Sequence, residues 1–201
     1  MKPLDAQMSV YAAYHRNRWC KLTHFIGVPA IVLAIPIPLF WVQLGAGVTL
    51  AHVIVGLVLL YYFMLDIPLA LGMTLCFAAV LYIAGEIAGM GTGVAWTWFA
   101  ILFVGGWIIQ FVGHAFEGRR PALVDNIWQI FMAPIFLLAE AGFALGWKID
   151  LRDRIESRLQ LGAIEARLRV AEPPLRTIEV PPRDVAISPS DGVARNDSRL
   201  S

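Results

Sequence analysis

The stretch AWTWFAILFVGGWIIQFVGHAFEGRRP, from Ala95 to Pro121, joins a long apolar run to a short polar segment. The apolar part, Ala95–Gly113, is close to the ~20 residues that a helix needs to cross the hydrocarbon core of a bilayer. The polar part places a histidine, a glutamate and two arginines directly at its end. The stretch therefore predicts a membrane-spanning helix that carries polar chemistry at the membrane surface.

The composition of the whole chain also indicates a membrane protein. Of 201 residues, 58% are hydrophobic and only 15% are charged, and the apolar residues occur in long blocks. The mean hydropathy of +0.66 is too high for a soluble domain of this length. A net charge of +1 without a basic cluster argues against a nucleic-acid partner. The two cysteines lie far apart in the sequence, which argues against a disulfide or a cysteine-based zinc framework.

The apolar blocks predict an all-α, polytopic membrane bundle, because in lipid the backbone N–H and C=O groups of a spanning segment must hydrogen-bond to each other within a helix. A polar helix is expected over Leu4–Tyr14, before the first block. We predict four full crossings and a fifth apolar helix, Ile127–Trp147, which Pro134 and Glu140 indicate is bent or re-entrant. The four crossings are expected at Phe25–Leu44, Val48–Leu65, Leu69–Ala88 and Ala95–Gly113, with residues 85–93 as the loop before the fourth.

Three parts of the chain differ in composition. Residues 1–147 hold the apolar blocks and form the predicted membrane domain, and residues 148–172 predict an amphipathic cytoplasmic helix. Residues 173–201 are rich in proline and polar residues, which predicts a disordered tail. Lysines and arginines gather before the first crossing and after the fourth, so the positive-inside rule places both of these edges on the cytoplasmic side.

Three histidines from distant parts of the sequence are expected at one membrane depth. His24 lies at the start of the first crossing, His114 lies at the end of the fourth, and His15 lies just outside on the same side. His52 is near the opposite end of the second crossing, on the order of 20 Å away by helix rise, and is left out of the site. On one continuous helix His15 and His24 would point in opposite directions, so we expect the chain to break at Asn17.

The residues around these histidines suit a metal ion. Imidazole binds iron, zinc, copper or nickel, and two or three histidines with at most one carboxylate are typical of non-haem iron oxygenases. Gln110 and His114 share a helix face, which Glu117 extends if the helix continues. Glu117 could bind the metal or orient a histidine. Arg119 and Arg120 could bind a carboxylate, although they also fit ordinary anchors at a cytoplasmic membrane surface.

Two motifs resemble those of a known family. The first is Tyr14-His15 followed by His24 within HFIGVP, and the second is Gln-Phe-x-Gly-His, then a glutamate, then Arg-Arg-Pro-Ala-Leu-x-Asp-Asn, over Gln110–Asn126. Together they resemble the iron(II)-dependent 2-hydroxy fatty acid dioxygenases, which are small multi-span membrane proteins of fatty acid α-oxidation. Members of that family often have asparagine where this chain has Cys20.

The resemblance implies that residues 1–147 form a catalytic domain that holds Fe(II). The implied reaction converts a 2-hydroxy fatty acid and O₂ to CO₂ and a fatty acid one carbon shorter. Apart from the resemblance, the lack of a targeting sequence fits a bacterial inner membrane or an endoplasmic reticulum membrane, and the positive-inside rule puts the site on the cytoplasmic side. The candidate residues are His15, His24 and His114 as catalytic metal ligands, Glu117 as a further ligand, and Arg119, Arg120 and Gln110 as substrate contacts.

Two other interpretations stay open from the sequence. His24 and His114 could instead be the axial ligands of a haem in a membrane electron-transfer protein. A transporter or scaffold without chemistry would need none of the histidines. In every case the lipid bilayer is a partner, and the glycine-rich packing positions are compatible with a homo-oligomer.

Overall fold

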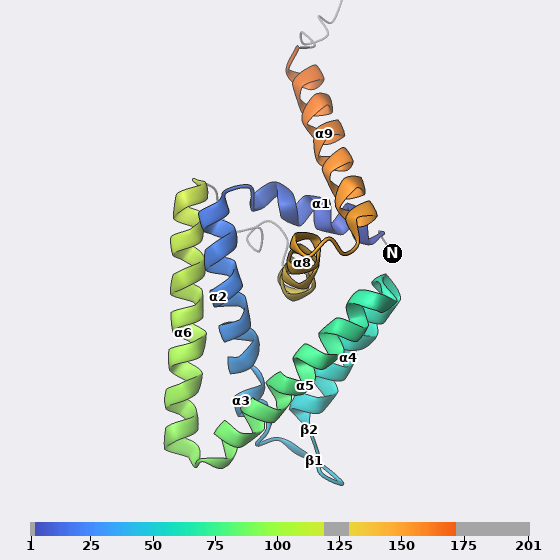
Figure 1. The fold of residues 1–201 in the computed structure, drawn as a ribbon. Helices are drawn as coiled ribbons and strands as arrows, with labels where there is room; N and C mark the ends of the chain where they lie inside the picture. The colour runs from blue at the N-terminus through green and yellow to red at the C-terminus, as the bar shows by residue number, and fades with distance from the viewer. Residues whose placement is uncertain (1–2, 119–128, 172–201) are drawn as a thin grey trace, which may run out of the picture.

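The computed structural model describes residues 3–118 and 129–171, and most of these residues are helical (Figure 1). A short antiparallel hairpin of β1 (Gln43–Gly45) and β2 (Val48–Thr49) joins two of the helices. The predicted all-α class is confirmed. The helices are α1 (Leu4–Tyr14), α2 (Arg18–Ala34), α3 (Pro36–Leu39), α4 (Leu50–Leu65), α5 (Ile67–Gly89), α6 (Thr92–Glu117), α8 (Gln129–Ala144) and α9 (Ile149–Ala171).

Three helical segments are long and apolar enough to cross a membrane. They are α2 continued by α3 (Arg18–Leu39), α5 and α6. Large apolar side chains point outward from them, such as Leu75, which is 75% exposed, and Tyr82, which is 70% exposed. Side chains of this size and polarity are stable on an outer surface when lipid covers it, so the apolar helices form a membrane-embedded bundle.

The predicted second crossing is shorter than expected. The segment predicted at Val48–Leu65 becomes a helix only at Leu50, because β2 takes its first residues. The backbone N–H of Thr49 donates a hydrogen bond to His52 Nδ1 at 3.2 Å, which fixes the first turn of α4. The resulting 16 residues of α4 fall short of the ~20 that span a bilayer core. His52 thus has a structural role at the far end of the bundle.

Two other predicted boundaries are wrong. The first crossing begins at Arg18 rather than Phe25, because the polar residues after Asn17 continue the helix. Residues 85–93 are not a loop: α5 continues to Gly89 and α6 begins at Thr92. Gly91 has a φ of 99°, a conformation that favours glycine, and it reverses the chain within two residues.

The predicted bend in the last apolar helix is present, but it lies at another place. α8 and α9 meet at 113°, and the break falls after Ala144 rather than at Pro134, which lies inside α8. Gly146 has a φ of 77° in this break. The predicted helix over residues 148–172 corresponds to α9, whereas the predicted tail over 173–201 lies outside the described residues.

Close contact between α2 and α6 positions the functional site. The two helices run side by side along most of their length (Figure 1). A Cβ added at Gly106 would lie 2.7 Å from Ile31 Cγ1, and one added at Gly27 would lie 2.8 Å from the Gly106 carbonyl oxygen. At Gly113 it would lie 1.9 Å from Thr23 Oγ1. Only glycine fits at these positions, and it allows the two backbones to approach closely.

Helix α1 lies across the end of this pair, and α8 and α9 hold it there (Figure 1). Its buried face carries Leu4, Met8 and Tyr11, which pack into the main apolar core with residues of α8 and α9. An ion pair of 2.5 Å between Arg158 Nε and Asp5 Oδ2 adds a polar contact between α9 and α1. The end of α1 is therefore fixed above α2 and α6.

Candidate metal centre

Three histidine side chains meet where α1, α2 and α6 come together. His15 caps the end of α1, His24 lies in α2, and His114 lies in the last turn of α6. The ring centroids of His15 and His24 are 4.4 Å apart, those of His15 and His114 are 5.2 Å apart, and those of His24 and His114 are 5.0 Å apart. All three residues are buried, with exposed fractions of 2%, 3% and 7% in chain order. The structure thus brings together the three histidines that the sequence selected.

The chain reverses at Asn17, as the spacing of the histidines predicted. Asn17 is the N-cap of α2, and its Oδ1 accepts a hydrogen bond from the backbone N–H of Trp19 at 2.8 Å. The Asn17 side-chain amide donates to the Phe116 carbonyl oxygen at 3.1 Å. The Asn17 side chain therefore caps the start of α2 and also connects the turn between α1 and α2 to the end of α6. The corner lets His15 fold back against His24.

The hydrogen bonds of two rings define which nitrogens are available. His15 Nδ1 lies 2.8 Å from the Tyr11 carbonyl oxygen, and His24 Nδ1 lies 2.8 Å from the Cys20 carbonyl oxygen. A carbonyl oxygen only accepts, so Nδ1 of each ring carries the proton and donates it. The two Nε2 atoms face each other at 3.1 Å. In neutral rings both of these atoms carry lone pairs, so they cannot hydrogen-bond to each other.

The facing nitrogens fit a bound cation. Burial lowers the pKa of His15 to about 4, so its ring is neutral near neutral pH and a proton does not bridge the pair. Two imidazole nitrogens bound to one metal ion at about 2.1 Å and at a right angle lie roughly 3.0 Å apart. The 3.1 Å between the Nε2 atoms matches that separation. Imidazoles of His15, His24 and His114 are therefore a suitable donor set for a first-row transition metal.

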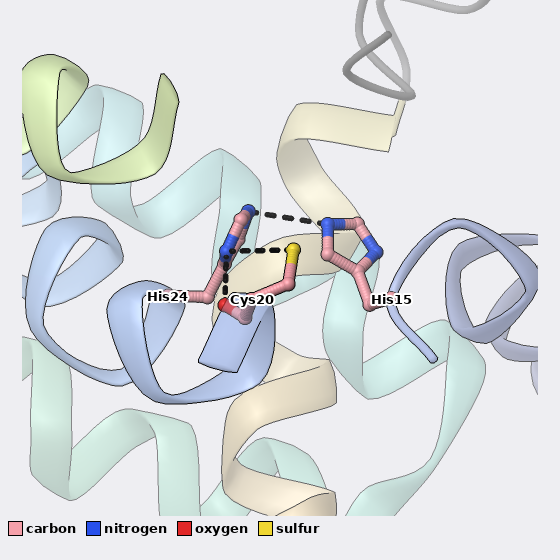
Figure 2. Close-up of side chains that lie close together, drawn as sticks. All are labelled: His15, Cys20 and His24. Carbon is pink, nitrogen blue, oxygen red and sulfur yellow. Dashed lines mark hydrogen bonds between the residues drawn. The ribbon is translucent and has the colours of Figure 1, made fainter. Parts of the chain in front are cut away.

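A buried thiol lies beside the histidines, and the sequence analysis did not select it. Figure 2 shows Cys20 next to His24, with Sγ 3.8 Å from His24 Nδ1, and Cys20 is fully buried. One ligand atom from each of His15, Cys20 and His24 falls within 4.8 Å of the others. The thiol lies near the protonated nitrogen of His24, so the imidazole Nε2 atoms are the stronger ligand set. The i,i+4 spacing of Cys20 and His24 was the available signal.

Charged residues surround the outer side of the cluster. Lys21 Nζ forms an ion pair of 2.8 Å with Glu140 Oε2, which joins α2 to α8. A pocket of about 390 Å³ opens beside His15, and the cations Arg16, Lys21 and Arg152 and the acids Glu140 and Glu156 contribute to its lining. The Tyr11 ring stacks on His15 with centroids 4.1 Å apart. His15 thus borders a polar pocket lined by charged residues.

The inner side of the cluster is apolar. A cavity of about 260 Å³, partly open to the outside, lies between α2, α3, α4, α6 and α8. Gln110 lies on its wall, and the Gln110 side chain lies beside the His24 ring. The predicted contact residue Gln110 therefore links the histidines to an apolar space.

The remaining predicted site residues are not placed in the site by the structure. Glu117 is the last residue of α6, but its side chain is outside the described part of the chain. Arg119 and Arg120 also lie outside the described residues. Their assignment as a metal ligand and as substrate contacts stays a prediction.

The fold and the site define a class: small helical membrane proteins with a buried cluster of imidazoles suited to a metal ion. A family model described as "2-hydroxy-palmitic acid dioxygenase Mpo1-like" matches residues 1–145, and the chain belongs to this family. The 2-hydroxy-palmitic acid dioxygenase MPO1 of Saccharomyces cerevisiae is 34% identical over 170 residues, which are 83% of this chain and 95% of that protein. No solved structure matches the chain.

Proposed function

We propose that this chain is an Fe(II)-dependent dioxygenase of 2-hydroxy fatty acids. The proposed reaction takes the hydroxy acid and O₂ to a fatty acid one carbon shorter, CO₂ and water, which balances all atoms. The observation that carries the proposal is the buried cluster of His15, His24 and His114, with two unprotonated Nε2 atoms 3.1 Å apart. The activity in the name of the yeast relative supports the same substrate class.

His15, His24 and His114 would hold the iron through imidazole nitrogens. Bound ferrous iron supplies the single-electron chemistry that lets O₂ react with a closed-shell acid. The carbonyl groups of Tyr11 and Cys20 fix the orientation of two rings through the Nδ1 hydrogen bonds, at no cost of rearrangement when the metal binds. The burial of the three rings limits the access of water to the reacting atoms.

The chain offers cations for the carboxylate of the substrate. Arg119 and Arg120 remain the proposed carboxylate contacts, because a guanidinium binds a carboxylate through two parallel hydrogen bonds. Lys21 is a described cation on the same side of the cluster, where it lines the polar pocket with His15. We place this polar face on the cytoplasmic side of a bacterial inner membrane or an endoplasmic reticulum membrane, in accord with its lysines and arginines.

A product assay tests the proposal. The protein is purified in detergent, loaded anaerobically with ferrous iron, given 2-hydroxypalmitate, and then exposed to O₂ before mass spectrometry of the fatty acids. We expect pentadecanoic acid, dependent on both iron and O₂. His114→Ala should lose iron and turnover together, whereas His52→Ala, at the far end of the bundle, should keep both.

Two outcomes would count against the proposal. Turnover by protein that contains no iron would exclude the metal mechanism. A Soret band in the purified protein, with no product, would favour a haem-binding electron-transfer protein with His24 and His114 as axial ligands. Absence of both metal and product would favour a transporter or scaffold.

A further inference from the structure

The apolar cavity extends away from the histidines toward the opposite end of the bundle. Val28, on its wall, lies one turn after His24 in α2, and Gln110 lies one turn before His114 in α6. One end of the cavity therefore lies next to the histidine cluster. The full lining is Val28, Ile31, Val32, Ile35, Pro36, Leu39, Ala51, Ile54, Val55, Val58, Tyr62, Phe77, Trp107, Gln110, Ile130, Phe131, Ala133 and Pro134.

The length of the cavity follows from its lining along α2 and α3. Leu39 lies 11 positions after Val28 in a nearly continuous helical segment, and the wall follows this segment. At a rise of 1.5 Å per residue this is roughly 16 Å. Leu39 in α3 and Ala51 at the start of α4 mark the end remote from the histidines, next to the β1–β2 hairpin (Figure 1). The cavity is thus elongated along the direction of α2 and α3.

The few polar groups of the wall already have partners. The Tyr62 hydroxyl donates to the Phe131 carbonyl oxygen at 2.6 Å, and the Gln110 side chain lies beside the His24 ring. The remaining lining is hydrocarbon, apart from the indole of Trp107. A cavity of this kind binds water poorly, because water needs two or more polar partners. A hydrocarbon chain matches it in shape and polarity.

We propose that this cavity holds the acyl chain of the substrate and that Leu39 and Ala51, at its remote end, limit the length of the chain. The inference rests on the proposed function, because that function supplies a head group that must reach the histidines. An amphiphile with its acid group at the cluster can place its chain along the apolar direction that starts at Val28 and Gln110. An ordinary bilayer lipid lacks the 2-hydroxy acid group that is proposed to bind at the histidines.

Two substitutions of opposite effect test the role of the remote end. Ala51→Leu adds bulk to a fully buried position on the wall, so it should shorten the accepted chain. Leu39→Ala removes bulk from the same end, so it should extend the accepted chain. The matched control is Gly56→Leu, because an added Cβ at Gly56 in α4 meets no atom within 4 Å.

Binding is measured without turnover, on anaerobic and iron-free protein, by the quenching of Trp107 fluorescence. Trp107 lines the cavity three residues before Gln110, near the histidine end. Its emission is isolated as the difference between the wild type and Trp107→Phe. A 2-hydroxystearic acid brominated near its carboxyl end should quench this emission more strongly than one brominated near its methyl end. Unlabelled 2-hydroxypalmitate should reverse the quenching.

The expected shifts are specific to chain length. Ala51→Leu should weaken the binding of 2-hydroxypalmitate about tenfold, as expected when one to two methylene groups lose their buried position, and should leave 2-hydroxylaurate unchanged. Leu39→Ala should move the preference toward 2-hydroxyarachidate and longer acids. Gly56→Leu should follow the wild type with every acid. Turnover profiles of the iron-loaded proteins should shift in the same directions.

The failure of this inference differs from the failure of the proposed function. Turnover with a chain-length profile that neither variant changes would overturn the acyl-chain assignment and leave the reaction intact. Chain-dependent quenching without any turnover would support the cavity assignment and count against the reaction. Quenching by a brominated phosphatidylcholine that 2-hydroxypalmitate does not reverse would show that the cavity holds bilayer lipid, and would overturn the inference.

Discussion

The substitution Gly113→Ala tests how the contact between α2 and α6 supports the metal centre. The added methyl group would lie 1.9 Å from Thr23 Oγ1 and 3.1 Å from Thr23 Cβ. Non-bonded carbon and oxygen atoms need about 3.3 Å, so the contact is too short by roughly 1.4 Å. Thr23 cannot rotate away freely, because its hydroxyl donates a hydrogen bond to the Cys20 carbonyl oxygen at 2.8 Å. Either that hydrogen bond breaks or the helices separate.

The size of the effect follows from these contacts. Overpacking in a well-packed interior costs about 1–3 kcal/mol, and the gain in helix propensity from glycine to alanine offsets at most about 1 kcal/mol. We therefore expect the free energy of unfolding to fall by about 1–2 kcal/mol. His114 follows Gly113 directly and His24 follows Thr23 directly. A separation of this size exceeds the ~0.5 Å tolerance of a preorganised site, so iron affinity should fall at least tenfold.

The assay compares thermal denaturation in detergent with the iron content of the purified protein. Gly105→Ala is the matched control, because an added Cβ at this glycine, about two turns earlier in α6, meets no atom within 4 Å. Thr23→Ala combined with Gly113→Ala removes the hydroxyl that clashes and should restore most of both properties. The two changes should couple by about 1–2 kcal/mol in a double-mutant cycle. If Gly113→Ala matches Gly105→Ala in stability and iron content, helix contact does not control the site.

Three further predictions concern the corner, the ion pair and the metal. Asn17→Ala removes both the cap of α2 and the donor to the Phe116 carbonyl oxygen, so it should lower the stability by about 1–2 kcal/mol in thermal melts; Asn17→Asp keeps the cap acceptor and should recover part of that loss. Burial raises the pKa of Asp5, but the hydrogen bond and the charge of the Arg158 guanidinium together lower it by more, so the pKa lies below its ordinary value. The ion pair therefore stabilises the attachment of α9 fully above about pH 4, the pKa of Asp5 in the unfolded chain, and this stabilisation is lost as the pH falls through the lower pKa of the folded chain. Hydrogen exchange in α9 should show this loss at acid pH, and Asp5→Asn should abolish the pH dependence. Ferrous iron at a hundredfold excess over its dissociation constant should stabilise the wild type by about 2.7 kcal/mol and leave the thermal melt of His114→Ala unchanged, whereas equal stabilisation of both would place the metal elsewhere.

The sequence predicted those features that depend on local spacing. The bounds of α1 match the prediction over Leu4–Tyr14. Pro3 lies directly before this helix and His15 directly after it, so local sequence marks both ends. The break at Asn17 followed from the spacing of nine positions from His15 to His24, which rules out one continuous helix for a shared site. The common membrane depth of the histidines followed from the alternation of apolar blocks and turns.

Features that depend on distant contacts were not predicted. Glycines at 85–93 indicated a loop, yet a Cβ at Gly85 would lie 3.3 Å from the Phe40 ring, so tight packing rather than a turn explains a glycine there. The β1–β2 hairpin lies between two apolar blocks with little local signal to separate strand from helix. The Lys21–Glu140 pair joins residues 119 positions apart, and only the folded chain reveals it.

The long sequence distance within the metal centre has a consequence for biogenesis. Asn17 and Phe116, which hydrogen-bond at the edge of the centre, are 99 positions apart. During synthesis the N-terminal histidines therefore emerge long before His114, and the donor set is complete only after α6 has been made and has packed against α2. If the chain binds iron as proposed, metal loading is a late event that reports correct membrane insertion. Nascent chains arrested before His114 should insert their first helix without retaining iron.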